Sequence, residues 1–114
     1  MEIVRTGVYE RGLKRLRKLG ATDADIEAME DAIALDPRTG EVIRATGGLR
    51  KVRFAYGGGG KRGGGRTIYY VLSDEGVVYM IAAYAKVDKD DVTTDEKRLF
   101  KALVKELTDA RATD

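Results

Sequence analysis

Near the N-terminus, apolar positions repeat with the period of an α-helix. A short strand is predicted at Glu2–Arg5, followed by a helix with the apolar stripe Tyr9, Leu13 and Leu16. Gly20 is placed as the C-terminal stop of this helix. Thr22 and Asp25 form a capping box for a second helix, which Pro37 ends and whose apolar stripe is Ile26, Met29 and Ile33. The pattern therefore predicts a strand and then a helical hairpin.

After Pro37 the pattern of apolar residues changes to one that is typical of β-strands. Three runs rich in β-branched and aromatic residues are LRKVRFAY at 49–56, RTIYYVLS at 66–73 and VVYMIAAYA at 77–85. Asp74-Glu75-Gly76 is a good tight turn between the second and third runs. Short connections of this kind favour antiparallel pairing in a meander. The segment Glu41–Ala45 is predicted to add a short edge strand.

The last predicted element is a helix. Thr93 and Glu96 form its capping box, and its apolar face is Leu99, Phe100, Leu103, Val104 and Leu107. Residues Asp109–Asp114 are predicted to be a frayed tail. The order of elements predicts an α+β fold, with an N-terminal helical hairpin packed on a small, mainly antiparallel sheet with a C-terminal helix. A length of 114 residues fits a single domain over residues 1–114.

Composition limits the chemistry of the chain. It contains no cysteine, which excludes disulfides and thiolate zinc sites. It also contains no histidine, which removes the commonest metal ligand and the usual general base at neutral pH. We therefore expect neither a metal nor a cofactor. No apolar run approaches the roughly 18 residues that span a membrane, and the N-terminus has no signal-peptide pattern, so we expect a cytoplasmic protein.

The net charge of +2 hides a segregation of charge along the chain. The segment from Val42 to Ser73 contains no acidic residue, and its basic residues are Arg44, Arg50, Lys51, Arg53, Lys61, Arg62 and Arg66. Acidic residues outnumber basic ones on both sides of this segment. Such a local excess of positive charge is typical of a protein that binds a polyanion, with RNA or DNA foremost.

The glycine-rich stretch AYGGGGKRGGGR at 55–66 admits three interpretations. A linker would need an independent domain on each side, for which the chain is too short. A phosphate-binding P-loop needs Ser or Thr after Lys61 and then a helix, whereas Arg62 and a strand are found there. The stretch is therefore interpreted as a hairpin loop with Lys61 and Arg62 at its tip. That tip is either an ordinary solvated loop or a contact for a phosphate backbone.

Basic residues also mark the predicted strands. Strand alternation places Lys51 and Arg53 on one face, with Arg50 on the other. Arg66 begins the next strand and Lys86 follows the third, so a regular meander gathers these cations at one end or face of the sheet. Among them lie four tyrosines, most of them core or rim residues and one or two able to stack on bases: Tyr69, Tyr70, Tyr79 and Tyr84.

Such a site can cut RNA without histidine or a metal. A base must take the proton from a ribose 2′-OH, cations must stabilise the charge on the phosphorane, and an acid must protonate the leaving 5′ oxygen. Arginine suits the second task through bidentate contact with phosphate. Lysine suits the first task only if its pKa falls. Lys51 lies between Arg50 and Arg53 in the sequence, and close like charges favour the neutral amine.

Several segments together resemble the RelE/ParE toxin superfamily, and most closely its HigB-like, RelE-type branch. They are GGLRKVRFA, GKRGG, RTIYYVLSDEGVVYMIAAYAK and DDVTTDE with the closing helix, and they span roughly residues 41–107. The resemblance implies a cytoplasmic toxin of a bacterial type II toxin–antitoxin pair. RelE-type members are ribosome-dependent mRNA endonucleases, which use the 2′-OH of the mRNA as nucleophile and no metal.

The resemblance also implies roles for individual residues. Lys51 is expected to be the base or a phosphate ligand. Arg53 and Arg66 are expected to clamp the transition state, and Lys86 to be a supporting cation or acid. The residues expected to bind mRNA or ribosomal RNA are Arg50, Lys61, Arg62 and Tyr84. At Gly65 the sequence departs from this branch, in which the position usually carries a side chain.

Partners and two alternative functions complete the expectations. The resemblance implies the ribosome, mRNA and a cognate antitoxin of the HigA-like, helix-turn-helix type, which would cover the basic face or clamp the helices. A ParE-like toxin has the same fold but inhibits DNA gyrase by protein binding. Clustered cations argue mildly against that function, because protein-binding sites favour aromatic and apolar anchors. A non-catalytic nucleic-acid-binding domain would bind in a salt-sensitive manner without cleavage.

Overall fold

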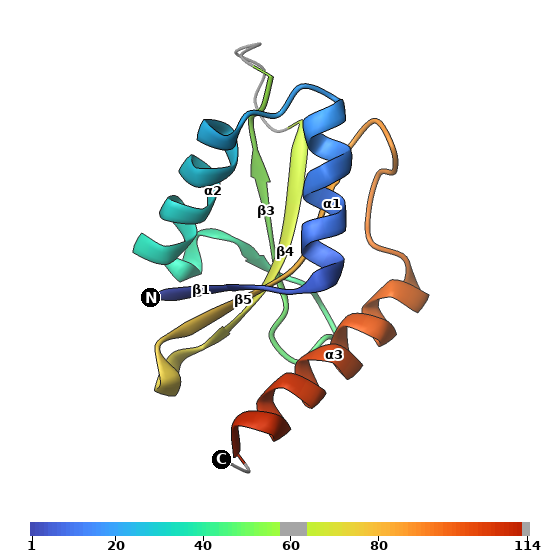
Figure 1. Ribbon diagram of the computed structural model, residues 1–114. Coiled ribbons are helices and arrows are strands. Elements are labelled where there is room, and N and C mark those ends of the chain that lie inside the picture. Colours follow the sequence, from blue (N-terminus) through green and yellow to red (C-terminus); the bar gives the residue numbers. More distant parts are fainter. Residues whose placement is uncertain (58–63, 113–114) are drawn as a thin grey trace.

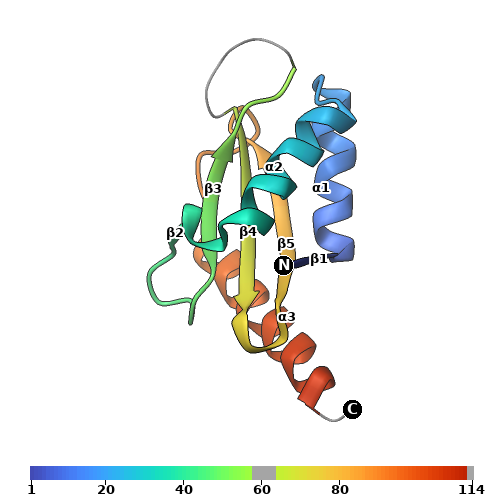
Figure 2. The same cartoon turned by 90° about the vertical axis from the view of Figure 1, so that its left-hand side faces the viewer.

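The computed structural model describes residues 1–57 and 64–112. In chain order the elements are β1 (Glu2–Arg5), α1 (Gly7–Lys18), α2 (Asp23–Leu35), the 3-10 turn η1 (Pro37–Thr39), β2 (Glu41–Val42), β3 (Arg50–Phe54), β4 (Gly65–Leu72), the 3-10 turn η2 (Ser73–Glu75), β5 (Val77–Ala85) and α3 (Thr94–Ala112). Helices α1 and α2 cover one face of the sheet and α3 lies against the other (Figures 1 and 2). This arrangement confirms the predicted α+β fold with a helical hairpin and a C-terminal helix. None of the described helices is long and apolar enough to cross a membrane.

The sheet has five strands in the order β1-β5-β4-β3-β2. Strands β2 to β5 pair antiparallel, as the short connections predict. Strand β1 instead pairs parallel with β5, in a register that runs from Glu2 opposite Val77 to Arg5 opposite Met80. This pairing joins segments that lie far apart in the sequence, so no local pattern predicts it. It makes β5 a central strand, and all nine of its residues are buried.

Helix α1 lies unusually close to β5. A Cβ atom at Gly12 would stand 2.0 Å from the carbonyl oxygen of Ala83, a distance that no real side chain tolerates. Thr6 caps α1 by accepting the N–H of Tyr9 at 3.2 Å, and its hydroxyl donates to the carbonyl of Met80 at 2.8 Å. The missing side chain at Gly12 therefore lets the helix and its cap contact the backbone of β5 directly.

A buried polar cluster ties α1 and α2 to β1. The hydroxyl of Tyr9 donates to Glu30 Oε2 at 2.6 Å, and Arg5 donates to the same carboxylate through two nitrogens at 2.8 and 2.9 Å. Burial, followed by the hydrogen bond to Glu30, raises the pKa of Tyr9 far above its usual range. Because every group in this cluster has a partner, its burial does not leave an uncompensated charge in the core.

The capping signals in the sequence are confirmed. Thr22 and Asp25 exchange both hydrogen bonds of a capping box, and so do Thr93 and Glu96. Helix α3 continues to Ala112, whereas the sequence analysis predicts a frayed end from Asp109. An ion pair of 2.8 Å between Lys105 and Asp109 stabilises this last helical segment.

One edge strand and one turn differ from the sequence prediction. The edge strand expected at Glu41–Ala45 is only Glu41–Val42, because Ala45 has a φ of 62° and the chain bends there. The tight turn expected at 74–76 is the 3-10 turn η2 followed by Gly76 in the left-handed region. Neither change alters the pairing of the strands it connects.

Gly65 has a packing role. It lies directly opposite Phe54 in the β3–β4 pair. A Cβ atom at Gly65 would stand 2.4 Å from the ring of Phe54. The ring of Phe54 therefore covers the glycine backbone, and a side chain at position 65 would displace it.

We expect Gly12→Ala to lower the free energy of unfolding by about 2 kcal/mol or more, because the added methyl group meets backbone atoms that cannot retract. Urea denaturation followed by circular dichroism measures this change. Gly7→Ala is the matched control in the same helix, since the nearest atom to its new Cβ is 3.8 Å away. Its stability should stay within about 0.5 kcal/mol of the parent protein. Equal stabilities of the two variants would contradict the close approach.

Candidate functional site

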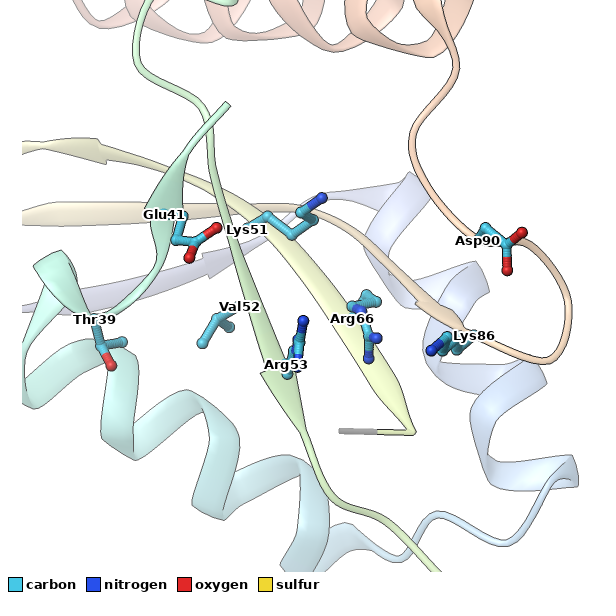
Figure 3. Close-up of a pocket in the computed structure, with 8 residues that line it drawn as sticks. All are labelled: Thr39, Glu41, Lys51, Val52, Arg53, Arg66, Lys86 and Asp90. Carbon is cyan, nitrogen blue, oxygen red and sulfur yellow. The ribbon is translucent and has the colours of Figure 1, made fainter. Parts of the chain in front are cut away.

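A basic pocket of about 410 Å³ lies at the end of the sheet where β3 and β5 end and β4 begins. It is lined by Thr39, Glu41, Lys51, Val52, Arg53, Arg66, Lys86 and Asp90 (Figure 3). We call these eight residues the basic pocket. The structure thus brings together the four cations that the sequence analysis singles out as candidate catalytic residues.

Strand register explains this convergence. Arg53 lies opposite Arg66, which in turn lies opposite Tyr84, so the three side chains share one face of the sheet. Lys51 is on the same face, opposite Ile68. Lys86 follows directly after β5, and its N–H donates to the carbonyl of Gly64 at 2.9 Å. Three strand ends therefore deliver their cations to one place, on the face that α3 partly covers.

The two arginines form an arrangement that favours an anionic ligand. Like charges directly opposite each other on paired strands are destabilising. Arg66 is only 7% exposed, and its Nη1 donates to the carbonyl of Gly65 at 3.0 Å, which fixes the guanidinium in place. Arg53 is exposed. A phosphate between them would relieve the repulsion and accept hydrogen bonds from both planar groups.

Acidic residues from outside the basic segment also reach the site. The Nζ atom of Lys51 donates to Asp91 Oδ1 at 2.9 Å, and the same oxygen accepts the N–H of Val92 at 2.7 Å. The hydrogen bond from Lys51 lowers the pKa of Asp91. Glu41 lies opposite Lys51 in the β2–β3 pair, and Asp90 lines the basic pocket. The chain therefore neutralises part of its own cationic site.

Sequence reasoning misses these carboxylates because they lie before and after the acid-free segment. The contact between Lys51 and Asp91 spans 40 positions. The only local signal is the pair Asp90-Asp91 in the segment that follows the last strand. Since that segment also carries Lys86, its position beside the site could have been proposed, but the partner of Asp91 could not.

Arg50 does not lie in the basic pocket. It lies opposite Tyr69, and its Nη1 donates to the carbonyl of Gly40 at 2.7 Å. Strand alternation turns it away from Lys51 and Arg53, as the sequence predicts. The other two candidate RNA-binding cations, Lys61 and Arg62, lie outside the described residues.

Tyr84 lies in the wall behind the site. It is 8% exposed, and Lys89 stands over its ring at 4.7 Å from the centroid. Its hydroxyl is buried and has no hydrogen-bond partner among the described residues. Burial, followed by the charge of Asp91, raises the pKa of Tyr84 to about 12. Tyr84 therefore packs beside Arg66 with little of its ring exposed.

The described residues hold no group of three acidic side chains that could bind a metal ion. The donors that the basic pocket offers are ammonium and guanidinium groups, which bind anions. Groups of this kind are suited to binding an anion such as phosphate.

Comparisons with known proteins give two findings. A family model described as the RelE toxin of the RelE/RelB toxin–antitoxin system matches residues 11–114. Among solved structures, the chain is similar to a mutant of the E. coli toxin RelE in the free state, in which two arginines are replaced by alanine. That match has a TM-score of 0.51 and 17% sequence identity, and covers 78% of this chain and 86% of that chain. At this identity the solved structure supports the fold.

Replacing Lys51 by alanine should raise the pKa of Asp91 toward the ordinary carboxyl value, because the hydrogen bond and charge that lower it are removed. Carboxyl carbon shifts in an NMR pH titration measure the change. Because folding lowers the pKa of Asp91, the pair stabilises the fold at neutral pH, and this contribution is lost as the pH falls below about 4. Lys105→Ala, which removes the partner of Asp109, is the control. An unchanged Asp91 titration in Lys51→Ala would show that the pair does not form in solution.

Proposed function

The chain belongs to the RelE toxin family, and we propose that this toxin inhibits translation by cutting mRNA on the ribosome. In the proposed reaction the ribose 2′-OH of the mRNA attacks the adjacent phosphorus. The bond from phosphorus to the 5′ oxygen breaks, which leaves a 2′,3′-cyclic phosphate and a 5′-OH. Because the nucleophile comes from the substrate, the protein has to position the strand, move protons and stabilise charge.

The observation that carries this proposal is the placing of Arg53 opposite Arg66 at the mouth of the basic pocket. Two guanidinium groups are suited to the equatorial oxygens of a phosphorane, where negative charge grows during the reaction. Arg66 is buried and fixed, so it needs little reorganisation when the charge develops. Arg53 is exposed and can close onto the phosphate from the solvent side.

Lys51 and Lys86 fit the remaining tasks. We propose that Lys51 serves as phosphate ligand or as base, and that Lys86 supports the charge or protonates the leaving 5′ oxygen. Either role of Lys51 requires its Nζ to leave Asp91, to which it is bound at 2.9 Å. An incoming phosphate replaces that carboxylate, since both are anions and the phosphate also contacts the arginines. Substrate binding therefore exchanges an internal anion for an external one.

A toxin of this family has an antitoxin as its partner. We propose that the antitoxin is of the HigA-like, helix-turn-helix type and that it covers the basic pocket. The cations that line this pocket outnumber its carboxylates by four to two. An antitoxin segment that supplies further carboxylates there would compete directly with mRNA.

Lys51→Ala and Arg53→Ala should each lower mRNA cleavage by about 100-fold or more and abolish growth arrest, because each removes a group that stabilises transition-state charge. Expression in a growing bacterium, with mRNA 5′ ends mapped soon after induction, measures both effects. Arg98→Ala is the matched control, since this exposed arginine on α3 lies outside the basic pocket. For the buried Arg66, Arg66→Lys keeps the charge and tests the planar contact.

The parent protein should give new 5′ ends confined to translated regions and in register with codons. A folded and fully toxic Lys51→Ala protein would falsify the site assignment. Growth arrest by the parent protein with intact mRNA would instead favour inhibition of DNA gyrase by protein binding. Salt-sensitive RNA binding without cleavage, and without any effect of Lys51→Ala, would favour a binding domain.

A further inference from the structure

A second pocket lies beside the basic pocket and has a volume of about 530 Å³. Two arginines line it, Arg38 and Arg50, together with the aromatic ring of Tyr70 and the loop glycines Gly47 and Gly48. We call this the second pocket. None of these residues belongs to the set that lines the basic pocket.

Two segments of the chain contribute lining residues to both pockets. Along the chain from η1 to β2, Pro37 and Arg38 face the second pocket, whereas Thr39 and Glu41 face the basic pocket. Along β3, Arg50 faces the second pocket and residues 51–53 line the basic pocket. The two pockets therefore lie on either side of these two segments, with Arg50 on the sheet face opposite Lys51 and Arg53 and donating to the carbonyl of Gly40.

The outer edge of β3 is paired with β2 over only part of its length. Strand β2 pairs only with Arg50 and Lys51, so no described strand pairs with the outer edge of β3 from Val52 onward. Arg50 and Arg53 are three positions apart, which corresponds to about 10 Å at the usual rise of a strand. Their side chains leave opposite faces of the sheet, so a single-stranded oligonucleotide that contacts both arginines has to pass around this edge.

The second pocket has the charge and shape of an anion site. Arg50 is held by its bond of 2.7 Å to Gly40, and its other donors make no hydrogen bond or ion pair with a described residue. The only carboxylate that lines the pocket, among the described residues, is Asp36, which accepts the backbone N–H of Arg38 at 3.2 Å. Two guanidinium groups therefore face one carboxylate that already has a partner. This excess of positive charge favours a phosphodiester over a cation.

The ring of Tyr70 and the loop at Gly48 form another part of the lining of the second pocket. A Cβ atom at Gly48 would lie 3.3 Å from the ring of Tyr70, so a side chain there would crowd the ring. Gly48 has a φ of 117° and Ala45 a φ of 62°, and both are in the left-handed region. The loop is thus bent to bring backbone and ring together beside the arginines.

We propose that the second pocket is an RNA subsite, which binds a phosphodiester of the same strand whose scissile phosphate lies in the basic pocket. This proposal rests on the proposed mRNA cleavage and extends it. Arg38 and Arg50 are positioning residues here, because they hold the strand at a distance from the reacting phosphate. Their contribution grows with the length of the RNA, whereas that of Arg53 and Arg66 does not.

The test compares two fluorescently labelled RNA probes, a dinucleotide and a hexanucleotide, with 2′-O-methyl riboses so that neither is cut. Fluorescence anisotropy over a series of salt concentrations gives the affinity and its salt dependence for the full chain. Arg38→Ala should weaken hexanucleotide binding about tenfold and leave dinucleotide binding unchanged. The salt slope for the hexanucleotide should fall by about 0.7 for each phosphate that the variant no longer neutralises.

Two further variants make the result specific. Arg50→Ala should behave like Arg38→Ala, but it also removes the bond to Gly40, so Arg38→Ala, which changes an exposed residue, is the primary variant. Arg98→Ala removes the same charge from α3 and should affect neither probe. Wild-type affinity of Arg38→Ala and Arg50→Ala for the hexanucleotide would overturn the proposal, as would an equal weakening of binding to both probes.

The outcomes separate this proposal from the proposed function. In one outcome, the parent protein cuts mRNA in cells in register with codons but binds both probes equally. That result would overturn the second subsite and leave the proposed cleavage standing. A parent protein that leaves mRNA intact in cells overturns the proposed cleavage and the subsite with it.

Discussion

The fold depends on how closely α1 can approach β5. Gly12 sets this distance, because any side chain there would meet the carbonyl of Ala83. At that separation the hydroxyl of Thr6 reaches the carbonyl of Met80, and β1 can pair parallel with the strand on its way into the helix. Strand β5 is then buried along its whole length. Since Lys86 follows directly from it, one of the four pocket cations is positioned by this packing.

The cations of the basic pocket repel one another, and the fold has to offset this repulsion. Arg53 and Arg66 face each other across paired strands, an arrangement that costs stability in the free protein. The chain offsets part of that cost with carboxylates from other elements, of which Asp91 on Lys51 is the clearest case. These carboxylates are good counterions but poor competitors for a phosphate that contacts several cations at once. If the basic pocket binds RNA as we propose, the site is thus stable enough to fold and still open to its ligand.

Local signals in the sequence predict local structure well in this chain. The capping boxes that begin at Thr22 and Thr93 and the strand at 77–85 all appear where the pattern places them. Strand alternation also predicts that Arg50 turns away from its neighbours. What the sequence does not contain is pairing at long range. The parallel β1–β5 pair and the contact of Asp91 with Lys51 join distant segments, and the packing of Phe54 on Gly65 becomes visible only when β3 and β4 are paired.

The outer edge of β3 has a consequence for handling the protein. From Val52 onward no described strand pairs with this edge, and unpaired edges invite edge-to-edge association between copies. Arg53 lies on that edge and is exposed, so its charge acts as a gatekeeper against such self-association. The same guanidinium that we propose to contact RNA therefore also keeps the molecules apart. Loss of this charge, as in Arg53→Ala, would therefore leave the edge open to association between copies of the chain.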